Sequence, residues 1–255
     1  FDKYLKFIKR NKLQYKEIKN SKLTSTKIEG TVSTNEKILD YFKIKKKIKY
    51  KLSKSSVNLK LNSQLDQSIL RYQKYDKIII AAYKNNNDIL KRLGLKVEKK
   101  FRYELVEKIA ISLPKKYKDI SFVVLDGKFV CVDPYLGTPY HLLSHVKYSK
   151  LQIIKRKFSK FSKKYDSALI NTKSLNKKLS NFNKFIDDGS KYLPFLKKAK
   201  YIYSYYVVRT LKSNVESTDE RTNLTQFINN NVLTVLAGKW NTCVYEAKKI
   251  EKLSI

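Results

Sequence analysis

The stretch Asp76-Lys77-Ile78-Ile79-Ile80-Ala81-Ala82 indicates the fold more clearly than any other part of the sequence. Its apolar run has the length of a strand, and such a run is typical of a strand buried on both faces of a parallel sheet. A polar turn at Asn85–Asn87 and a short helix ending near Gly94 are expected to follow. The sequence therefore predicts a strand–turn–helix unit in a protein of mixed α and β structure.

The end of the chain has a similar pattern. Val232–Leu236 is expected to form a strand, Ala237–Lys239 a tight turn, and the residues from Asn241 onward an amphipathic helix. The first N–H groups of such a helix have no partner within it, and the helix dipole adds partial positive charge at the same end. With Lys239 beside them, these groups are expected to stabilise an anion, either a phosphate or the charge on a reduced flavin ring.

Antiparallel strands are expected between these two units. Residues 103–114 and 201–211 favour strands, and residues 122–125 and 129–132 favour a hairpin closed by Asp126-Gly127. Val57–Leu61 alternates between apolar and polar residues, which predicts a further half-buried strand. The pattern therefore combines a parallel sheet with antiparallel hairpins.

Helices are expected in two further regions. Ser33-Thr34-Asn35-Glu36 has the form of a capping box, which predicts a helix from there to about Leu52. Lysines 45–47 and 49 would then form the solvent face of that helix. Residues 146–200 are rich in Lys, Ser and Asn and are expected to form helices on the outside, with Phe158 and Phe161 on a helical stripe.

Composition limits the possible classes of protein. The 255 residues are 42% hydrophobic and 13% aromatic, which excludes a wholly disordered chain. No apolar run approaches the roughly 20 residues of a membrane span. Two cysteines, Cys131 and Cys243, make no disulfide framework, so a reducing compartment is expected and the cytoplasm is the predicted location.

The charge of the chain is strongly positive, because 56 Lys and Arg face 22 Asp and Glu for a formal balance of +34. Only 7 of the basic residues are arginine, although arginine often dominates surfaces that recognise phosphate and guanine. Drift in an A/T-rich coding sequence also produces a composition this rich in lysine. A polyanionic partner is therefore one hypothesis, which the charge alone does not establish.

Few residues suit common catalytic sites. His141 and His145 are the only histidines, and no third ligand lies near them in the sequence, so no metal site is expected. The six glycines form neither Gly-x-Gly-x-x-Gly nor a P-loop. Arg209 and Arg221 stand out because arginine is rare. Such an arginine forms a structural ion pair with Asp219 or Glu220, is an arginine codon that survived drift, or anchors a substrate carboxylate or phosphate.

The order of these motifs resembles the flavin-dependent oxidoreductases of the D-amino-acid oxidase and glycerol-3-phosphate dehydrogenase type. Ala237-Gly238-Lys239-Trp240-Asn241-Thr242 is similar to the Gly-Gly-Lys-(Leu/Trp)-Thr-Thr signature that closes the flavin site. Ser204–Arg209 is similar to a strand that ends in Gly-x-Arg-Pro, and Thr218–Arg221 lies where a second arginine-bearing segment is found. Tyr75–Tyr83 is similar to a buried strand that ends in Ala-(Ala/Thr)-Gly, with Tyr83 in place of the glycine.

This resemblance implies FAD as cofactor and removal of a hydride from a small anionic hydroxy- or amino-acid-like substrate. It implies that Arg209, with Arg221 as second choice, orients the substrate anion. His141 is expected to accept a proton, because histidine is rare in this chain and suits that task. The residues expected to bind the cofactor are Ala81, Ala82, Tyr83, Gly238, Lys239, Trp240, Asn241 and Thr242.

The resemblance also implies a division of the chain. Residues 35–94 and 226–255 are expected to belong to a flavin domain, and residues 1–34 and 95–225 to an antiparallel-sheet substrate domain. The Gly-rich βαβ unit that holds the flavin pyrophosphate is expected to be missing from this chain, because no Gly-x-Gly-x-x-Gly is present.

Two other classes of function remain open. A basic binding protein of the same ancestry would hold RNA or another polyanion on the lysine-rich faces Lys43–Lys51 and Lys155–Lys164. A scaffold without any ligand is the third hypothesis. The sequence does not determine the oligomeric state.

Overall fold

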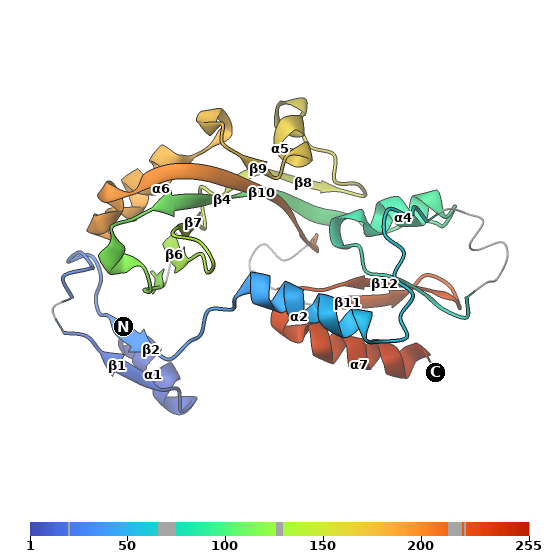
Figure 1. The fold of residues 1–255 in the computed structure, drawn as a ribbon, viewed down its shortest axis with the longest axis horizontal. Coiled ribbons are helices and arrows are strands. Elements are labelled where there is room, and N and C mark those ends of the chain that lie inside the picture. The colour runs from blue at the N-terminus through green and yellow to red at the C-terminus, as the bar shows by residue number, and fades with distance from the viewer. Residues whose placement is uncertain (20, 66–74, 126–129, 214–220, 222, 255) are drawn as a thin grey trace. The chain divides into compact units, whose positions relative to one another are not determined.

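The computed structural model describes residues 1–19, 21–65, 75–125, 130–213, 221 and 223–254 (Figure 1). The expected turn at Asp126-Gly127 and the segment Thr218–Glu220 lie outside these residues. The predicted mixed α/β architecture with several sheets is confirmed. The helices are α1 (Asp2–Arg10), α2 (Tyr41–Ser53), α4 (Asn86–Arg92), α5 (Asp166–Ile170), α6 (Phe182–Gly189) and α7 (Cys243–Ser254). None of the helices in the described ranges is long and apolar enough to cross a membrane.

The strands form three sheets. They are β1 (Tyr15–Glu17), β2 (Val32–Thr34), β3 (Ile78–Ile80), β4 (Phe101–Ser112), β5 (Phe122–Val123), β6 (Val130–Pro134), β7 (His141–His145), β8 (Lys150–Arg156), β9 (Lys173–Ser174), β10 (Lys200–Lys212), β11 (Leu224–Phe227) and β12 (Val232–Leu236). Strands β1 and β2 form a hairpin, and seven strands form a sheet in the order β5-β6-β7-β4-β10-β9, with β8 paired to β4. The third sheet has the order β11-β12-β3.

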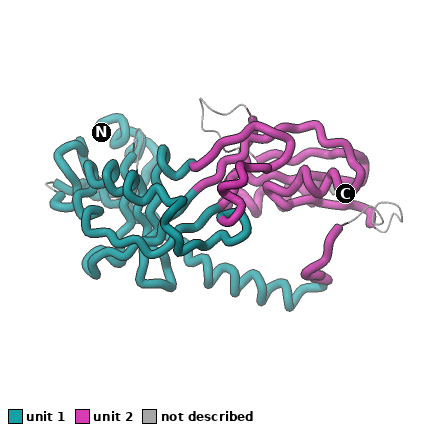
Figure 2. The backbone as a smooth tube through the Cα atoms, turned by 90° about the horizontal axis from the view of Figure 1, so that it is seen from above, with its two compact units in different colours: residues 1–57, 107–150, 168–206 teal, residues 58–106, 151–167, 207–255 magenta. Residues whose placement is uncertain are grey.

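The chain divides into two compact units (Figure 2). Unit 1 contains residues 1–57, 107–150 and 168–206, and unit 2 contains residues 58–106, 151–167 and 207–255. The long strands β4 and β10 each contribute one half to each unit. The expected division into flavin and substrate domains is a statement about ligands and stays a prediction.

Unit 1 is built around the antiparallel strands. Strand β6 pairs with β5 and β7, as expected for the hairpin, and β7 pairs with β4. Helix α6 covers this sheet with Phe185, which is fully buried. The core also contains Ile109, Val132 and Leu143, whose side chains are completely excluded from solvent. Burying each such side chain stabilises the fold by roughly 1.5–3 kcal/mol.

Unit 2 contains the parallel pair that the sequence predicts. Strand β12 runs parallel to β3, with Val232 opposite Ile78 and Thr234 opposite Ile80. Helix α4 packs on this sheet through Leu90, which with Ile80 and Val232 belongs to one apolar core. The prediction that β3 is buried on both faces is wrong, because Ile79 points away from this core and is 46% exposed.

The predicted start of α2 is wrong. Helix α2 begins at Tyr41, and the side chain of Asp40 caps it by accepting a hydrogen bond from the backbone N–H of Lys43 at 3.0 Å. Residues of the expected capping box cannot start a helix because Val32–Thr34 pairs with Tyr15–Glu17 in the β1–β2 hairpin. A pairing between distant segments therefore overrides the local signal.

Two other expectations from local pattern fail. Val57–Leu61 forms no strand, and its apolar side chains are 56–73% exposed, because nothing in the described chain pairs with it. Within the region expected to be helical, residues 150–156 form strand β8 and residues 157–162 form no helix. Phe158 and Phe161 therefore do not share a helical stripe, although Phe161 is buried.

Candidate functional site

The carboxyl ends of β3 and β12 lie at the same edge of the unit 2 sheet. The register of the parallel pair places Ile80, the last residue of β3, opposite Thr234 near the end of β12. Ala81–Tyr83 follow the first strand at this edge, and Gly238–Thr242 follow the second. The structure thus brings the two groups of predicted cofactor-binding residues to one edge, the usual ligand-binding place of parallel sheets.

Asn86 fixes the geometry of this edge. Its Oδ1 accepts a hydrogen bond from the Ala82 backbone N–H, and its Nδ2 donates to the Val235 carbonyl oxygen, both at 2.8 Å. Asn86 is 3% exposed, so both bonds satisfy groups that are shielded from water. The sequence assigned this asparagine only to a turn, because its partner Val235 is distant along the chain.

Tyr83 has an unusual backbone conformation. Its φ is +55°, in the left-handed region that favours glycine, and it occupies the position where the resembling family has glycine. The Tyr83 hydroxyl accepts a hydrogen bond from the Thr210 backbone N–H at 3.1 Å and lies 3.3 Å from the Thr210 carbonyl oxygen, to which it donates. A strained residue therefore ties the end of β3 to strand β10, directly beside Arg209.

Arg209 belongs to a buried ionic cluster. Its Nε donates to Oε2 of Glu104 at 2.7 Å, and its Nη2 donates to the same oxygen. Arg102 Nη2 lies 2.8 Å from the other oxygen, Oε1. The Glu104 side chain has no exposure, whereas the Arg209 side chain keeps 24%. The carboxylate orients the guanidinium of a side chain that is only partly buried.

An ion pair of Arg209 with Asp219 or Glu220 is one of the alternatives that the sequence leaves open. Asp219 and Glu220 lie outside the described residues, and the observed partner is Glu104, 105 positions away in the sequence. Glu104 has no special signal, since it alternates with apolar residues along β4 like any outward-facing side chain. Arg221 lies in unit 2 just before β11. The roles of both arginines in substrate binding stay predictions.

The turn after β12 is held by a polar network. The Gly238 backbone N–H donates to Asn223 Oδ1 at 2.6 Å, and Asn223 Nδ2 donates to Glu246 Oε1 at 3.0 Å. Glu246 in the first turn of α7 is 5% exposed, and its Oε2 accepts from the Thr225 hydroxyl at 2.8 Å. The Thr242 hydroxyl donates to the Lys239 carbonyl at 2.7 Å. This network shapes the turn.

The helix after this turn lacks an ordinary cap. Residues Trp240–Thr242 form a 3₁₀ turn that leads into α7, and Lys239 occupies the N-cap position without any side-chain hydrogen bond. Ser, Thr, Asp or Asn normally accept from the free N–H groups here, and a cation is disfavoured by the helix dipole. Trp240 is 57% exposed, so the turn is open to solvent. An anion bound at this helix start would relieve the conflict.

The donors of this turn suit the ring of the implied flavin. The N–H groups of Trp240 and Asn241 at the helix start, together with the Lys239 ammonium, would match the pyrimidine edge on which a reduced flavin carries negative charge. Lys239, Trp240 and Asn241 would hold that edge. No residues for the pyrophosphate are identified in the sequence, because it holds no Gly-x-Gly-x-x-Gly.

His141 belongs to unit 1, whereas the other predicted site residues belong to unit 2. Its Nε2 lies 2.9 Å from the Tyr117 carbonyl oxygen and donates to it, and the side chain is 2% exposed. The second nitrogen, Nδ1, is buried without a hydrogen-bond partner among the described residues. Nδ1 is therefore the nitrogen left to accept a proton, and this role stays a prediction.

His145 has a different environment from His141. Both lie on strand β7 and not on a helix, and His145 Nε2 lies 2.9 Å from Asp188 Oδ2. Burial lowers the pKa of His145, against the opposing effect of Asp188. In the described ranges, no group of three or more His, Cys, Asp or Glu side chains gathers as metal ligands.

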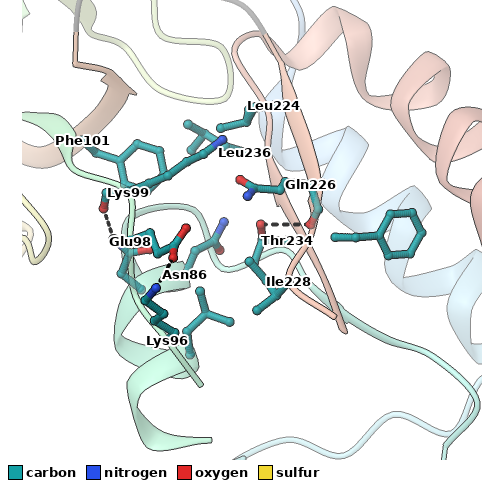
Figure 3. A pocket seen from close by; sticks show the side chains of 13 residues that line it. Asn86, Lys96, Glu98, Lys99, Phe101, Leu224, Gln226, Ile228, Thr234 and Leu236 are labelled. Carbon is teal, nitrogen blue, oxygen red and sulfur yellow. Dashed lines mark hydrogen bonds and ion pairs between the residues drawn. The ribbon is translucent and has the colours of Figure 1, made fainter. Parts of the chain in front are cut away.

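A cavity of about 280 Å³ lies next to the carboxyl edge in unit 2. Its walls come from α4, residues 96–101, β11 and β12, and it shares Asn86 and Leu236 with the edge. Figure 3 shows the ion pair of Lys96 and Glu98 on one side, with Gln226 and Thr234 on the strands. None of the predicted site residues lines it, and its residues come from segments too far apart for the sequence to reveal it.

Comparisons with solved structures give partial likenesses. Glycine oxidase from Geobacillus kaustophilus is 9% identical, with a TM-score of 0.44 over 70% of this chain and 41% of its own. Iminodiacetate oxidase from Chelativorans sp. BNC1 is 14% identical, with a TM-score of 0.40 over 64% and 37%. L-amino acid deaminase from Proteus vulgaris is 11% identical, with a TM-score of 0.40 over 65% and 44%.

The chain spans less than half the length of each of these structures. No protein-family model matches the sequence, and comparison with curated proteins finds no significant relative. Each of the three similar structures is an oxidase or a deaminase.

Proposed function

We propose that this chain carries the ring-binding and substrate-anchoring part of a flavin-dependent oxidoreductase. Its substrate would be a small anionic amino or hydroxy acid that loses a hydride. The observation that carries the proposal is the lysine at the uncapped start of the η6–α7 helix (η6, Trp240–Thr242), at the same sheet edge as Tyr83. Residues that conflict with local stability rules are typical of functional sites.

The residues of this edge would act in two ways. Lys239 and the first N–H groups of the helix would stabilise negative charge on the flavin ring. A bound flavin would supply the hydride acceptor. Arg209, oriented by Glu104, would hold the substrate carboxylate with its guanidinium, since its side chain keeps 24% exposure. Tyr83 would keep strand β10, and with it Arg209, at a fixed distance from the edge.

The test is a flavin titration of the intact protein, followed by fluorescence quenching. Riboflavin, which has the ring without phosphates, is expected to bind within a few-fold of FAD. A different result would show that the turn is a phosphate site and that the ring assignment is wrong. In that result FAD binds, riboflavin does not bind, and inorganic phosphate competes with FAD. If none of the flavins binds, the proposed function is wrong.

A matched pair of variants assigns the binding to the turn. Lys239→Gln is expected to weaken the binding of reduced, anionic riboflavin about fivefold more than that of neutral oxidised riboflavin, because losing about 1 kcal/mol of charge stabilisation corresponds to about fivefold in affinity. The shift in the midpoint potential of the bound flavin measures this difference. Lys248→Gln removes the same charge from an exposed position on α7 and is expected to change nothing. Equal losses in both variants would show that only net charge matters.

A further inference from the structure

Helix α2 has no buried residue, although it has thirteen residues and several large apolar side chains. Tyr41 is 60% exposed, Ile48 49% and Tyr50 64%. The helix is anchored at its start, where Phe42 stacks on Tyr135 with ring centroids 5.9 Å apart. A helix in a folded protein normally buries one face, so α2 presents a surface that its own unit does not use.

The charge of α2 is of one sign. Six of its thirteen residues are lysine, none is acidic, and its only ion pair in the described chain joins Lys43 to the capping Asp40 at 3.6 Å. In the whole chain, by contrast, 49 of 255 residues are lysine, so composition alone does not account for this density. Lysines four positions apart, such as Lys45 and Lys49, repel each other and destabilise an isolated helix.

The sequence alone explains these lysines as the solvent face of an amphipathic helix. That explanation requires an opposite face that is buried, and the structure lacks one. The like charges and the exposed rings together disfavour α2 as an isolated element. A polyanion with flat rings would relieve both costs at once, by pairing with the ammonium groups and covering the aromatic side chains.

We propose that α2 binds single-stranded nucleic acid, beyond the flavin function proposed above. Phosphates would pair with the lysines, and bases would stack on the exposed ring of Tyr50, which lies between Lys49 and Lys51. The helical repeat of 100° per residue points Lys45, Lys46 and Lys47 in three directions. A flexible nucleic-acid strand can reach lysines that point in all three directions. A flat membrane surface contacts only one side of a helix.

The test measures binding of fluorescein-labelled oligo(U) of 15 nucleotides to the intact protein across a salt series. The variant Lys45→Gln/Lys46→Gln/Lys49→Gln is expected to bind at least tenfold more weakly at 0.1 M salt. The slope of log K against log salt should fall by about 2, because each phosphate contact to a single strand contributes about 0.7. Circular dichroism checks that α2 remains helical.

The matched control removes the same charge elsewhere. Lys160→Gln/Lys163→Gln/Lys164→Gln changes exposed lysines of the second lysine-rich face and is expected to leave affinity and slope nearly unchanged. Equal losses in the two triple variants would overturn the proposal, since binding would then follow net charge alone.

Two further measurements separate nucleic acid from other polyanions. Tyr50→Ala keeps all charges and is expected to weaken oligo(U) binding about tenfold without changing the salt slope, because one stacked base is lost. An unchanged affinity in Tyr50→Ala would overturn the role of stacking and with it the proposed ligand. Binding to phosphatidylserine vesicles in preference to oligo(U) would overturn the proposal in favour of a membrane surface.

Discussion

Glu104 and Glu107 lie three residues apart on strand β4, both with no exposure to solvent, yet their surroundings differ. Glu104 in unit 2 faces two arginines, Arg102 and Arg209, and Arg209 keeps part of its side chain in contact with solvent. Among the described residues, Glu107 in unit 1 meets only neutral donors. Its Oε1 accepts from the Ser204 hydroxyl at 2.5 Å, and its Oε2 accepts from the Asn181 backbone N–H at 2.9 Å.

The difference teaches which buried carboxylate is structural. Burial raises the pKa of Glu107, and hydrogen bonds from Ser180, Ser204 and Asn181 only partly oppose this effect. Glu107 accepts a hydrogen bond from Asn181, the N-cap residue of helix α6, and is fully buried. Its role is therefore structural, within unit 1. Glu104 instead holds a cation whose outer part is exposed, which is the arrangement expected when an arginine is prepared for a ligand.

The largest effect is expected when Glu104 is changed. Glu104→Gln leaves the Arg102 guanidinium, on a side chain that is 11% exposed, and the more exposed Arg209 guanidinium without their carboxylate. This should lower the free energy of unfolding by about 3 kcal/mol. Glu107→Gln keeps hydrogen-bonding atoms at its site and should cost no more than about 1 kcal/mol. Urea unfolding of both variants measures the two costs, and equal costs would remove the distinction between the two sites.

A smaller effect is expected when the hydroxyl group of Tyr83 or of Tyr206 is removed. Tyr83→Phe leaves the buried backbone N–H of Thr210 without an acceptor and should cost about 1–3 kcal/mol. Tyr206→Phe removes a buried hydroxyl that makes no hydrogen bond among the described residues, so it should be neutral or slightly stabilising. Thermal unfolding compares them, and a larger loss in Tyr206→Phe would contradict the assignment of Tyr83.

The smallest effect concerns pH. Because the pKa of Glu107 is raised in the folded protein, the folded state binds more protons than the unfolded state above the ordinary glutamate pKa. Its contribution to stability is therefore fully present below that pKa and is lost as pH rises towards the raised value. Relative to Glu107→Gln, the unchanged protein should lose stability from about pH 4.5 upward. A constant difference across unfolding titrations would show that the pKa is not raised.

The sequence predicts the elements of the site better than their contacts. Strands β3 and β12 and helix α7 follow from apolar runs and helical spacing, which are properties of neighbouring residues. Local pattern also places Lys239 and Tyr83 after those strands. Their geometry at one edge depends on the parallel pairing, which the apolar run of Ile78–Ile80 already indicates.

The partners of the site residues could not be predicted in the same way. Asn86, Glu104 and Asn223 act on residues 149, 105 and 15 positions away, and nothing in their local sequence marks these contacts. The wrong prediction of a helix start at the capping box has the same cause, because Val32–Thr34 pairs with a strand elsewhere in the chain. Exposure of α2 is likewise a property of the whole fold.

Hydrogen exchange with and without riboflavin tests the central claim most directly, because it locates the ligand without requiring turnover. Residues 81–86 and 238–246 are expected to exchange more slowly in the presence of riboflavin, while the Glu107 site in unit 1 should be unaffected. Protection that spares both segments of the unit 2 edge and falls in another part of the chain would contradict the assignment of this edge as the flavin site.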